Sequence, residues 1–440
     1  MRRVLIVSPH FPPVNAPDMQ RVRMSLPYFV ENGWQPWVLT VASEYQDAPI
    51  EPALAATIPD DVPVVRTRAI PLRLTKPLGI GNVGIRAFWH LYRAGSRLIR
   101  EQQIDLVYFS TTMFAALPLG RLWKQRLGVP YVIDFQDPWF STYYDDKPVS
   151  ERPPKHGLAR RLHATLEPWT MKDVSGVVAV SEAYLETLQN RYPWLARDMC
   201  ATIPFGASER DFEIAGSHAA HSDRARSLHE CVGLSIGRGG ADMATAVRIL
   251  FRALRDGQHS EALLSSVRLR FVGTDYARDD RSKPTITPIA AAESVGGLVS
   301  ETPSRIGYLD SLSAMRSTDF LILIGSDDPQ YSPSKIYPYI LSRKPIVAVL
   351  HERSPLVDLL RRLNAGPIVT FAGRDDVVQP ARSLASQLST MLPDVQRSAS
   401  AADWTVASAY SARRLTRLQC RLFDAVLEPQ TSEVVMPCAG

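Results

Sequence analysis

The sequence predicts two doubly wound α/β domains, and two observations support this prediction. Short runs rich in Val, Ile and Leu recur along the chain, and each is followed by a polar turn and a helix-length segment. Most of these runs lack polar alternation, as expected of strands in a parallel sheet that helices cover on both faces. At 440 residues the chain is also too long for one ordinary core.

Six apolar runs in the first half of the chain are predicted to be strands. They are residues 4–8, 37–41, 62–67, 106–110, 131–135 and 177–180. Apolar residues at helical spacing predict helices at residues 113–128 and 182–192. The sequence Leu127-Gly128-Val129-Pro130 predicts the end of the first of these helices. The first run, at the N-terminus, is too short for an export signal and is interpreted as a buried strand.

A polar segment, residues 207–229, then interrupts the pattern and is interpreted as the interdomain connection. Strands are predicted again at 232–235, 267–272, 320–324, 346–350 and 368–371. A last helical region, 398–428, has an apolar face formed by Trp404, Tyr410, Leu415, Leu418, Leu422 and Phe423. The predicted division is therefore a first domain at 1–206, the linker at 207–229, a second domain at 230–397, the helical region at 398–428 and a loose tail at 429–440. Ligands bind at the carboxyl ends of parallel strands, which predicts a site in a cleft between the two domains.

Composition limits the class of protein. Hydrophobic residues make up 45% and charged residues 22%, which indicates a folded protein without extensive disorder. A net charge of +5 is compatible with an anionic small ligand, an anionic lipid surface or nucleic acid, and does not choose among them. No apolar run reaches the roughly 18 residues of a membrane span. Cys200, Cys231, Cys420 and Cys438 form no CxxC pair and are interpreted as free thiols, which predicts a reducing, cytoplasmic location.

The strongest local signal for chemistry is the segment 332–345. Ser332 or Ser334 can cap a helix start, and Pro333 suits the first helical position. The unpaired backbone N–H groups of such a start, with the charge of Lys335, predict a diphosphate site. An ordinary capped surface helix is the alternative interpretation.

A second candidate is the turn between a strand and a helix at residues 235–242. Gly237 and Gly239 let the backbone approach a phosphate, and Arg238 can neutralise it. The turn lacks the GxGxxG fingerprint, and the chain has no GKS or GKT phosphate loop, so a simple tight turn is the alternative.

Polar residues at strand ends of the first domain form a third candidate. Asp134 and Asp137 follow a predicted strand, and His10 follows the first one, so all three are expected at the ligand-binding edge. The alternative is that Asp137 caps a turn before Pro138 and that His10 is a loop residue. His, Asp and Cys do not occur at metal-ligand spacings, and no metal site is predicted.

Residues 62–100 are basic and contain no acidic residue. Aromatic residues stand beside cations at residues 88–93, on a predicted helix. This stretch either contacts an anionic membrane surface or packs its apolar side on the sheet while its cations are solvated. The cations are Arg66, Arg68, Arg73, Lys76, Arg86, Arg93, Arg97 and Arg100.

Taken in order, these segments resemble the family-4 glycosyltransferases, which have the two-domain GT-B fold. The landmarks are residues 4–13 (VLIVSPHFPP), 132–139 (VIDFQDPW), 178–182 (VAVSE), 203–206 (IPFG), 236–238 (IGR) and 333–345. The final helical region is similar to the crossover helix of this family, which returns to the first domain.

The resemblance implies transfer of a sugar from a nucleoside diphosphate donor to an acceptor glycan or lipid-linked sugar, with retention of configuration. It implies that Arg238, with the backbone near Ser334 and Lys335, binds the donor diphosphate without a metal or other cofactor. It also implies that Asp134 and Asp137 border the sugar and the acceptor hydroxyl. The expected setting is bacterial-type surface polysaccharide or glycolipid assembly.

Several positions depart from the family pattern. Gln330 and Pro338 stand where many members have two glutamates, and Arg343 stands where glycine is usual. Asp242 occurs where a lysine commonly follows, and the loop 14–18 lacks the usual glycines. Because Pro338 cannot bind a ribose, that contact is assigned to a replacement set: Asp327, Asp328 or Tyr337. We interpret the chain as a divergent, active subgroup.

Two alternatives come from other classes. The missing glutamates are compatible with a non-catalytic protein that binds a sugar nucleotide as a scaffold. A sugar-nucleotide 2-epimerase has the same two-domain fold, but needs more acidic and His groups around the sugar than this sequence offers. Nucleic-acid binding is disfavoured, because the basic stretch contains no recognition module.

Overall fold

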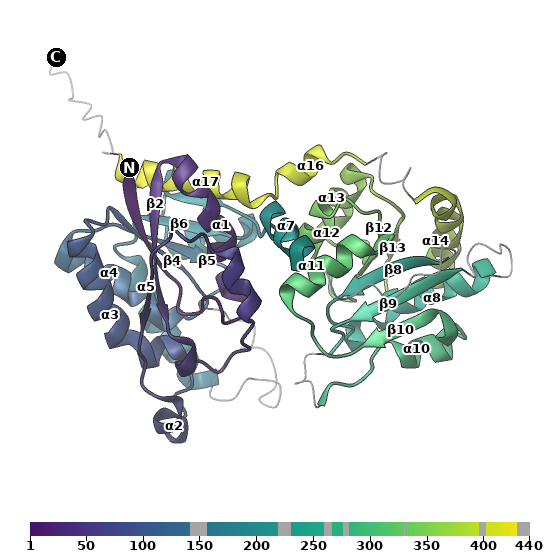
Figure 1. Cartoon of the computed structure of the whole chain (residues 1–440), viewed down its shortest axis with the longest axis horizontal. Helices are drawn as coiled ribbons and strands as arrows, with labels where there is room; N and C mark the ends of the chain where they lie inside the picture. Colours follow the sequence, from purple (N-terminus) through teal and green to yellow (C-terminus); the bar gives the residue numbers. More distant parts are fainter. Residues whose placement is uncertain are drawn as a thin grey trace, which may run out of the picture. The chain divides into compact units, whose positions relative to one another are not determined.

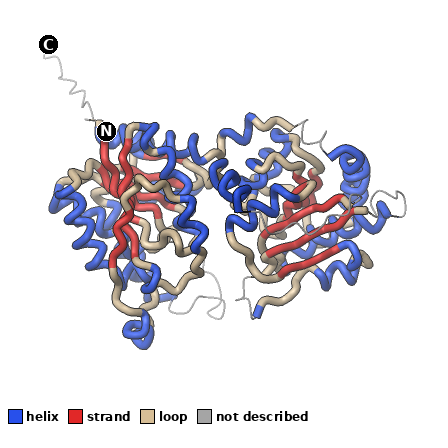
Figure 2. The backbone as a smooth tube through the Cα atoms, in the orientation of Figure 1, coloured by secondary structure: helices blue, strands red, loops and turns tan. Residues whose placement is uncertain are grey.

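The computed structural model describes residues 1–140, 156–218, 230–258, 266–275, 281–329, 331, 333–395 and 402–428. The chain forms two compact units, Met1–Phe205 with Ala412–Gly440, and Gly206–Ser411 (Figure 1). Each unit contains a sheet of parallel strands with helices on both faces, which Figure 2 shows by colour. The predicted fold class, two doubly wound α/β domains, is confirmed.

The first unit contains a seven-stranded sheet in the order β3-β2-β1-β4-β5-β6-β7. Every neighbouring pair is parallel, so the carboxyl ends of all the strands lie at one edge. The strands are β1 (Arg2–Val7), β2 (Trp34–Val41), β3 (Val64–Thr67), β4 (Leu106–Ser110), β5 (Tyr131–Phe135), β6 (Gly176–Ala179) and β7 (Cys200–Thr202).

Helices cover both faces of this sheet because successive side chains of a buried strand point to opposite sides. In β1, Leu5 and Val7 belong to a core shared with α3 and α4, whereas Val4 and Ile6 belong to one shared with α1 and α17. The helices of this unit are α1 (Gln20–Ser25), α2 (Leu72–Thr75), α3 (Val83–Glu101), α4 (Pro118–Leu127), α5 (His156–Met171), α6 (Glu182–Arg191) and α17 (Ala412–Leu427).

The second unit contains a six-stranded parallel sheet in the order β10-β9-β8-β11-β12-β13. Its strands are β8 (Cys231–Ile236), β9 (Val267–Val272), β10 (Val299–Thr302), β11 (Phe320–Ile324), β12 (Ile346–His351) and β13 (Ile368–Phe371). Its helices are α7 (Glu209–His218), α8 (Ala244–Gln258), α10 (Thr287–Ala292), α11 (Tyr308–Ser317), α12 (Ile336–Leu341), α13 (Leu356–Leu363), α14 (Val378–Met391) and α16 (Thr405–Ser408).

Every strand predicted from an apolar run is present, but two strands were not predicted. Both β7 and β10 lie at the edge of their sheets. All residues of β7 are half-buried, and those of β10 alternate between half-buried and exposed. An edge strand with one neighbour needs no continuous apolar run, and for that reason neither strand was recognised.

The segment expected to connect the domains is partly helical. Its residues Glu209–His218 form α7, which packs against α11 in the second unit. The hydroxyl of Tyr308 donates to Asp211 at 2.9 Å, and Arg316 donates to the carbonyl of Phe212 at 3.0 Å. Because these contacts are largely polar, the sequence of α7 shows few apolar residues at helical spacing. The rest of the predicted linker, 219–229, lies outside the described residues.

The last helical region divides at Ser411 and Ala412. Helix α16 belongs to the second unit, together with Trp404 and Tyr410. Helix α17 belongs to the first unit, where Leu415, Leu422 and Phe423 are buried. The apolar face predicted for 398–428 is therefore shared between two cores. The predicted tail, 429–440, lies outside the described residues.

Candidate active site

The turn after β8 is the glycine-rich loop of the second unit. Gly237 has φ +114°, and its N–H donates to the carbonyl of Val272 at 2.8 Å. The N–H of Gly239 donates to Thr274 at 2.8 Å, and a Cβ at Gly239 would lie 2.7 Å from Ile286. The two backbone hydrogen bonds hold the loop close to the end of β9, and the positive φ favours glycine at position 237.

Arg238 projects from this loop and is already paired with a carboxylate. Its two terminal nitrogens donate to Asp242 at 2.8 and 2.5 Å, and its guanidinium lies 5.3 Å from the ring centre of Tyr331. Asp242 also accepts from the hydroxyl of Ser326 at 2.6 Å, which ties the loop to the end of β11. Burial would raise the pKa of Asp242, but the hydrogen bonds from Arg238 and Ser326 outweigh it and hold that pKa below its ordinary value. The charge of Arg238 is thus largely balanced within the unit.

Lys335 is the second cation of the site, and its charge is not balanced. A Cβ at Gly237 would lie 3.6 Å from its Nζ. Among the described residues the ammonium has no hydrogen-bond acceptor or ion-pair partner. Burial and the charge of Arg238 lower the pKa of Lys335 to about 8. Two cations therefore lie at the carboxyl edge of the sheet, where Arg238 is paired with Asp242 and Lys335 is not, an arrangement suited to an anion.

The helix that follows Lys335 begins later than the sequence predicts. Helix α12 starts at Ile336 with Lys335 as its N-cap, and no side chain caps it. Ser334 is exposed, and its carbonyl accepts from the N–H of Tyr337 at 3.2 Å. The expected cap by Ser334 is therefore wrong, because a turn that starts at Pro333 already pairs the backbone with a 3.1 Å bond from the N–H of Ile336. Ser332 lies outside the described residues.

The hydroxyl of Tyr339 anchors α12 to the glycine-rich loop. It accepts from the N–H of Ile236 at 2.8 Å, and Tyr339 is fully buried. This contact places the start of α12 beside the loop after β8. The candidate phosphate site is therefore lined by side chains from two loops, not by the end of a long helix.

The other predicted donor residues lie at the same edge or close to it. Asp327 donates its N–H to the carbonyl of Asp242 at 2.7 Å, and its carboxylate accepts from Arg374 at 2.8 Å. Asp328 is exposed, and its N–H donates to Ser326 at 3.1 Å. The ring of Tyr337 packs against Tyr410 with 5.1 Å between centres. Pro338 lies within α12, and Gln330 lies outside the described residues.

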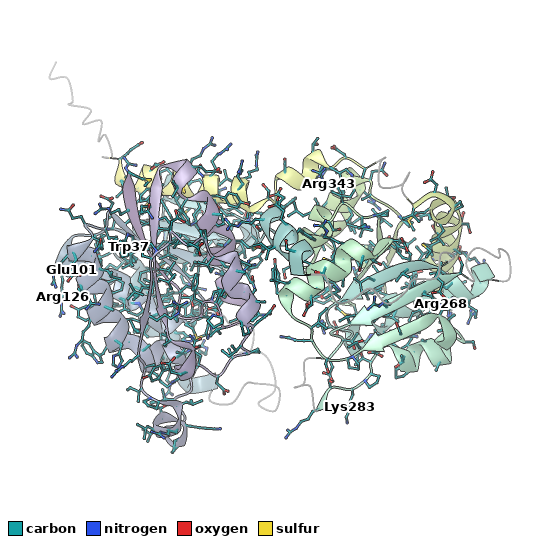
Figure 3. The ribbon with its side chains drawn as sticks, in the orientation of Figure 1. Trp37, Glu101, Arg126, Arg268, Lys283 and Arg343 are labelled. Atoms are coloured by element: carbon teal, nitrogen blue, oxygen red, sulfur yellow. The ribbon has the colours of Figure 1, made fainter. Side chains whose placement is uncertain are left out.

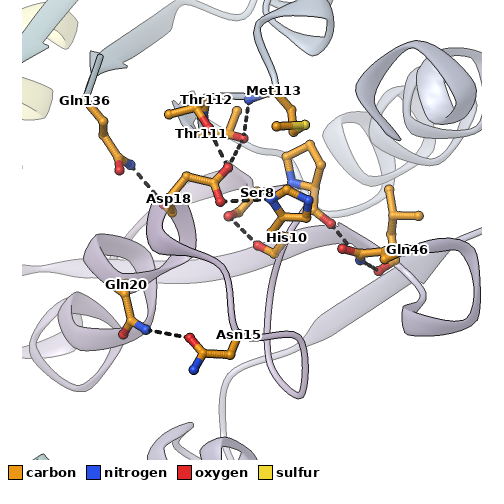
Figure 4. Close-up of polar contacts among 12 residues, drawn as sticks. Ser8, His10, Asn15, Asp18, Gln20, Gln46, Thr111, Thr112, Met113 and Gln136 are labelled. Carbon is orange, nitrogen blue, oxygen red and sulfur yellow. Dashed lines mark hydrogen bonds and ion pairs between the residues drawn. The ribbon is translucent and has the colours of Figure 1, made fainter. Parts of the chain in front are cut away.

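In the first unit, His10 is paired with Asp18, a residue that the sequence did not single out. Nδ1 of His10 lies 2.8 Å from Asp18. The same carboxylate accepts from the hydroxyl of Thr111 at 2.7 Å and from the N–H of Thr112 at 3.1 Å. Figure 4 shows Asp18 enclosed between His10 and the loop after β4. The one signal for this residue in the sequence was its acidic side chain in the loop after the first strand.

The electrostatics keep Asp18 ionised. Burial would raise its pKa, but the interaction with His10 and the other hydrogen bonds outweigh burial, and the pKa lies below its ordinary value. An ionised Asp18 accepts a hydrogen bond from Nδ1–H of His10, which leaves Nε2 as the unprotonated ring nitrogen. Asp137 is exposed at the end of β5, and desolvation together with the charge of Asp18 raises its pKa.

Asp134 is buried and supports this loop cluster without facing a ligand. It lies 2.9 Å from Nε of Arg21 and accepts from Ser110 at 2.7 Å. Gln136 donates both to Ser110 and to the carbonyl of Asp18, each at 2.9 Å. The expectation that Asp134 borders the sugar does not match this burial, because its strand lies in the middle of the sheet. Its role is to hold Arg21 and the loop of Asp18 in place.

Residues 20–206 match the glycosyl transferase 4-like domain. This match agrees with the resemblance to family-4 glycosyltransferases over residues 20–206. No curated protein matches the chain. In the described part of the chain, no group of three or more His, Cys, Asp or Glu residues is arranged to hold a metal ion.

Solved structures extend the similarity over nearly the whole chain. A glycosyltransferase from Rickettsia africae is 14% identical, covers 97% of this chain and 99% of its own, and has a TM-score of 0.57. HepE from Anabaena, in complex with UDP-glucose, is 16% identical, covers 97% of both chains and has a TM-score of 0.51. A putative UDP-N-acetylglucosamine 2-epimerase from Listeria monocytogenes is 11% identical over 94% of this chain and 93% of its own, with a TM-score of 0.51. These similarities establish the GT-B fold.

Proposed function

We propose that the protein is a glycosyltransferase that moves a sugar from a nucleoside diphosphate sugar to an acceptor hydroxyl. The observation that carries this proposal is the ammonium of Lys335, which lies beside Gly237 and Arg238 without an anionic partner. A diphosphate would supply the missing negative charge. The glycosyl transferase 4-like match and the UDP-glucose in the HepE structure support this choice of anion.

Negative charge accumulates on the diphosphate as its bond to the sugar breaks. Lys335 and the remaining donors of Arg238 are placed to stabilise that charge, and they are held in position before the reaction. We propose that these two cations suffice and that no metal ion is needed. Asp327 and Asp328, at the end of β11, are proposed to take over the ribose contact that Pro338 cannot make.

On the acceptor side, we propose that Nε2 of His10 and the carboxyl group of Asp137 contact the sugar and the acceptor hydroxyl. Asp18 and Asp134 are positioning residues, because they act through His10, Arg21 and Ser110. Replacing His10 with Ala is expected to lower the rate of transfer and to leave nucleotide affinity unchanged. A parallel loss of nucleotide affinity would remove His10 from the acceptor side.

We further propose that the transfer retains configuration at the anomeric carbon, as in the family that the sequence resembles. NMR of the first-formed product decides this point. An inverted product would overturn the proposal of retention, and would instead make His10 the base that deprotonates an acceptor attacking from the opposite face.

The acceptor that we propose is a glycan or a lipid-linked sugar, as in surface polysaccharide or glycolipid assembly in the cytoplasm. A lipid-linked acceptor would bring the enzyme to a membrane surface. Two other functions remain to be distinguished by turnover. Conversion of donor without an acceptor would indicate an epimerase, and binding without any turnover would indicate a scaffold.

Calorimetric titration with UDP, GDP, ADP and dTDP, and with their sugar conjugates, tests the donor site. We expect tight, base-selective binding without metal, and no increase when magnesium is added. Replacing Arg238 or Lys335 with Ala should each weaken binding by roughly 1–3 kcal/mol, the loss typical of a charged hydrogen-bonding partner. Arg382 of α14, an exposed cation of the same unit, is the matched control. Unchanged affinity in both folded variants would rule out this donor site.

A further inference from the structure

Five large apolar side chains are exposed close together in the sequence of the first unit. They lie in the segment that leaves β3, forms α2 and the 3-10 turn Lys76–Leu78, and enters α3. Leaving such groups in water is unfavourable, and a cluster of them marks an interaction site. We call these residues the α2–α3 surface: Ile70 (46% exposed), Leu74 (61%), Leu78 (73%), Ile85 (40%) and Trp89 (66%).

Backbone and side-chain contacts make this segment one compact piece. The N–H of Ile70 donates to the carbonyl of Arg86 at 3.0 Å, and the guanidinium of Arg86 donates back to the carbonyl of Ile70 at 2.8 Å. The N–H of Ile80 donates to Thr75 at 3.0 Å, which closes the turn after α2. In Figure 1, α2 lies beyond the ends of the strands of the first unit.

Cations alternate with these apolar side chains along the sequence. Arg68, Arg73, Lys76 and Arg93 are exposed, and among the described residues their side chains make no ion pair. Residues 62–100 contain no Asp or Glu. Arg86 does not contribute, because it is buried against three backbone carbonyls. The surface therefore combines exposed apolar groups with unbalanced positive charge.

We propose that the first unit docks on an anionic lipid bilayer through the α2–α3 surface and receives a lipid-linked acceptor there. The acceptor half of this inference rests on the proposed function, whereas the docking half does not. Leu74 and Leu78 enter the boundary between headgroups and acyl chains, and Arg73 and Lys76 pair with the headgroups. No helix among the described residues is long and apolar enough to cross a membrane, so the contact is peripheral.

The position of this surface in the fold suits delivery of an acceptor. Residue 68 follows β3 directly, so the segment leaves the sheet at the carboxyl edge, where His10 and Asp137 also lie. A cavity of about 240 Å³ lies between α3 and the loops after β4 and β5. Its lining includes Ile85 from the α2–α3 surface and Thr112, whose N–H donates to Asp18.

The rest of the cavity wall is mostly apolar, with Phe114, Trp139, Leu162 and Leu166. A wall of this kind fits the first apolar carbons of a lipid carrier, with the attached sugar directed toward His10. A free oligosaccharide would gain little there, because its hydroxyls would lose water without finding hydrogen-bond partners.

Vesicle flotation with the full chain tests the docking half. We expect binding to vesicles of phosphatidylglycerol mixed with phosphatidylcholine, weaker binding as salt is raised, and no binding to pure phosphatidylcholine. The double variants Leu74→Ser with Leu78→Ser, and Arg73→Glu with Lys76→Glu, should each bind about tenfold less tightly or worse. Trp194→Ser and Arg382→Glu are matched controls, because Trp194 (46% exposed) and Arg382 lie outside this surface. Vesicle binding that does not depend on lipid charge, or that both double variants retain, would overturn the docking proposal.

Transfer assays separate this inference from the proposed function. The double variants should keep wild-type nucleotide affinity and wild-type transfer to a water-soluble acceptor. They should lose most of their transfer to a lipid-linked acceptor in anionic vesicles. Narrowing the cavity with Ala115→Leu should raise KM for the lipid-linked acceptor and leave vesicle binding unchanged. Vesicle binding without any transfer would refute the proposed function and keep the docking, whereas equal use of both acceptors by every variant would refute the acceptor half.

Discussion

A single side chain, Lys335, combines the two properties that a diphosphate site needs. Within the described part of the chain it is a cation without a partner, and it lies close to Gly237 in the glycine-rich loop. The same properties lower the stability of the ligand-free protein when the lysine is charged, because burial and the charge of Arg238 both disfavour its charged form. Functional groups with displaced pKa values commonly occur at such sites.

Donor affinity should therefore depend on pH through Lys335. The anion binds the protonated lysine, whose pKa in the free protein is about 8. Affinity should be constant below that pH and fall about tenfold for each further pH unit. Calorimetry with UDP between about pH 7 and about pH 9.5 measures this, and Lys335→Arg should remove the fall because arginine stays charged. An unchanged slope in Lys335→Arg would assign the titration to another group.

The same lysine makes the free energy of unfolding rise with pH, whereas donor affinity falls. Between pH 8 and the ordinary pKa of 10.5, the unfolded chain holds a proton that the folded chain releases. The contribution of Lys335 to the free energy of unfolding therefore increases as the pH rises through that window. Binding weakens in the pH range where the ligand-free protein gains stability, which distinguishes loss of charge from general alkaline unfolding.

Arg343 shows how one departure from the family pattern costs stability. It follows α12 with φ +56°, in the left-handed region where glycine is favoured, and its side chain is exposed (Figure 3). Replacing it with Gly should stabilise the second unit by about 0.5–1 kcal/mol, because the relief of strain exceeds the extra entropy of the unfolded chain. Urea unfolding monitors the change. Arg343→Ala keeps the strain, so an equal gain in that variant would contradict this explanation.

At the scale of the element, α17 is held to the first unit by one aromatic cluster. Phe423 is fully buried, with ring centres at 5.1 Å from Tyr108, 5.4 Å from Trp34 and 6.4 Å from Phe29. Asp424 next to it accepts from the indole of Trp34 at 3.1 Å and from Arg2 at 2.7 Å. Helix α17 is thus part of the core that also contains β1.

Replacing Phe423 with Ala should lower the free energy of unfolding of the first unit by about 3–5 kcal/mol, the usual cost of a large buried ring. The loss of near-ultraviolet circular dichroism on heating monitors this unit through Trp34. Arg421→Ala, an exposed position of the same helix, should have little effect. Equal stability of the two variants would mean that α17 is not integral to the first core.

At the scale of the whole molecule, the two units have separate cores and should unfold in separate steps. The donor groups all lie in the second unit, and a ligand stabilises only the unit that binds it. A UDP concentration about a hundredfold above its dissociation constant adds about 2.7 kcal/mol to that unit. Differential scanning calorimetry should show one transition moving upward with UDP, whereas Phe423→Ala lowers the other one. A single transition that responds to both changes would show that the units unfold together.

The sequence by itself determined the fold class and most of the strands. Strands buried on both faces need continuous apolar runs, and such runs are visible without knowing any neighbour. The glycine-rich turn at 235–242 and Lys335 could also be singled out from the sequence as candidates, because glycines and a cation next to buried strands suit a phosphate site. The edge strands β7 and β10 were missed because they are only partly buried, so their sequences contain no continuous apolar run.

Which polar groups meet could be seen only in the folded chain. Asp18 is an acidic residue that the sequence analysis did not single out, yet it is the residue that pairs with His10. Asp134 had the expected strand-end position, but its place in the middle of the sheet buried it against Arg21. Arg238 was expected to bind a phosphate, and in the structure it is paired with Asp242, a contact that the sequence did not predict. Pairing between residues far apart in the chain is set by how the loops pack, and no local pattern encodes it.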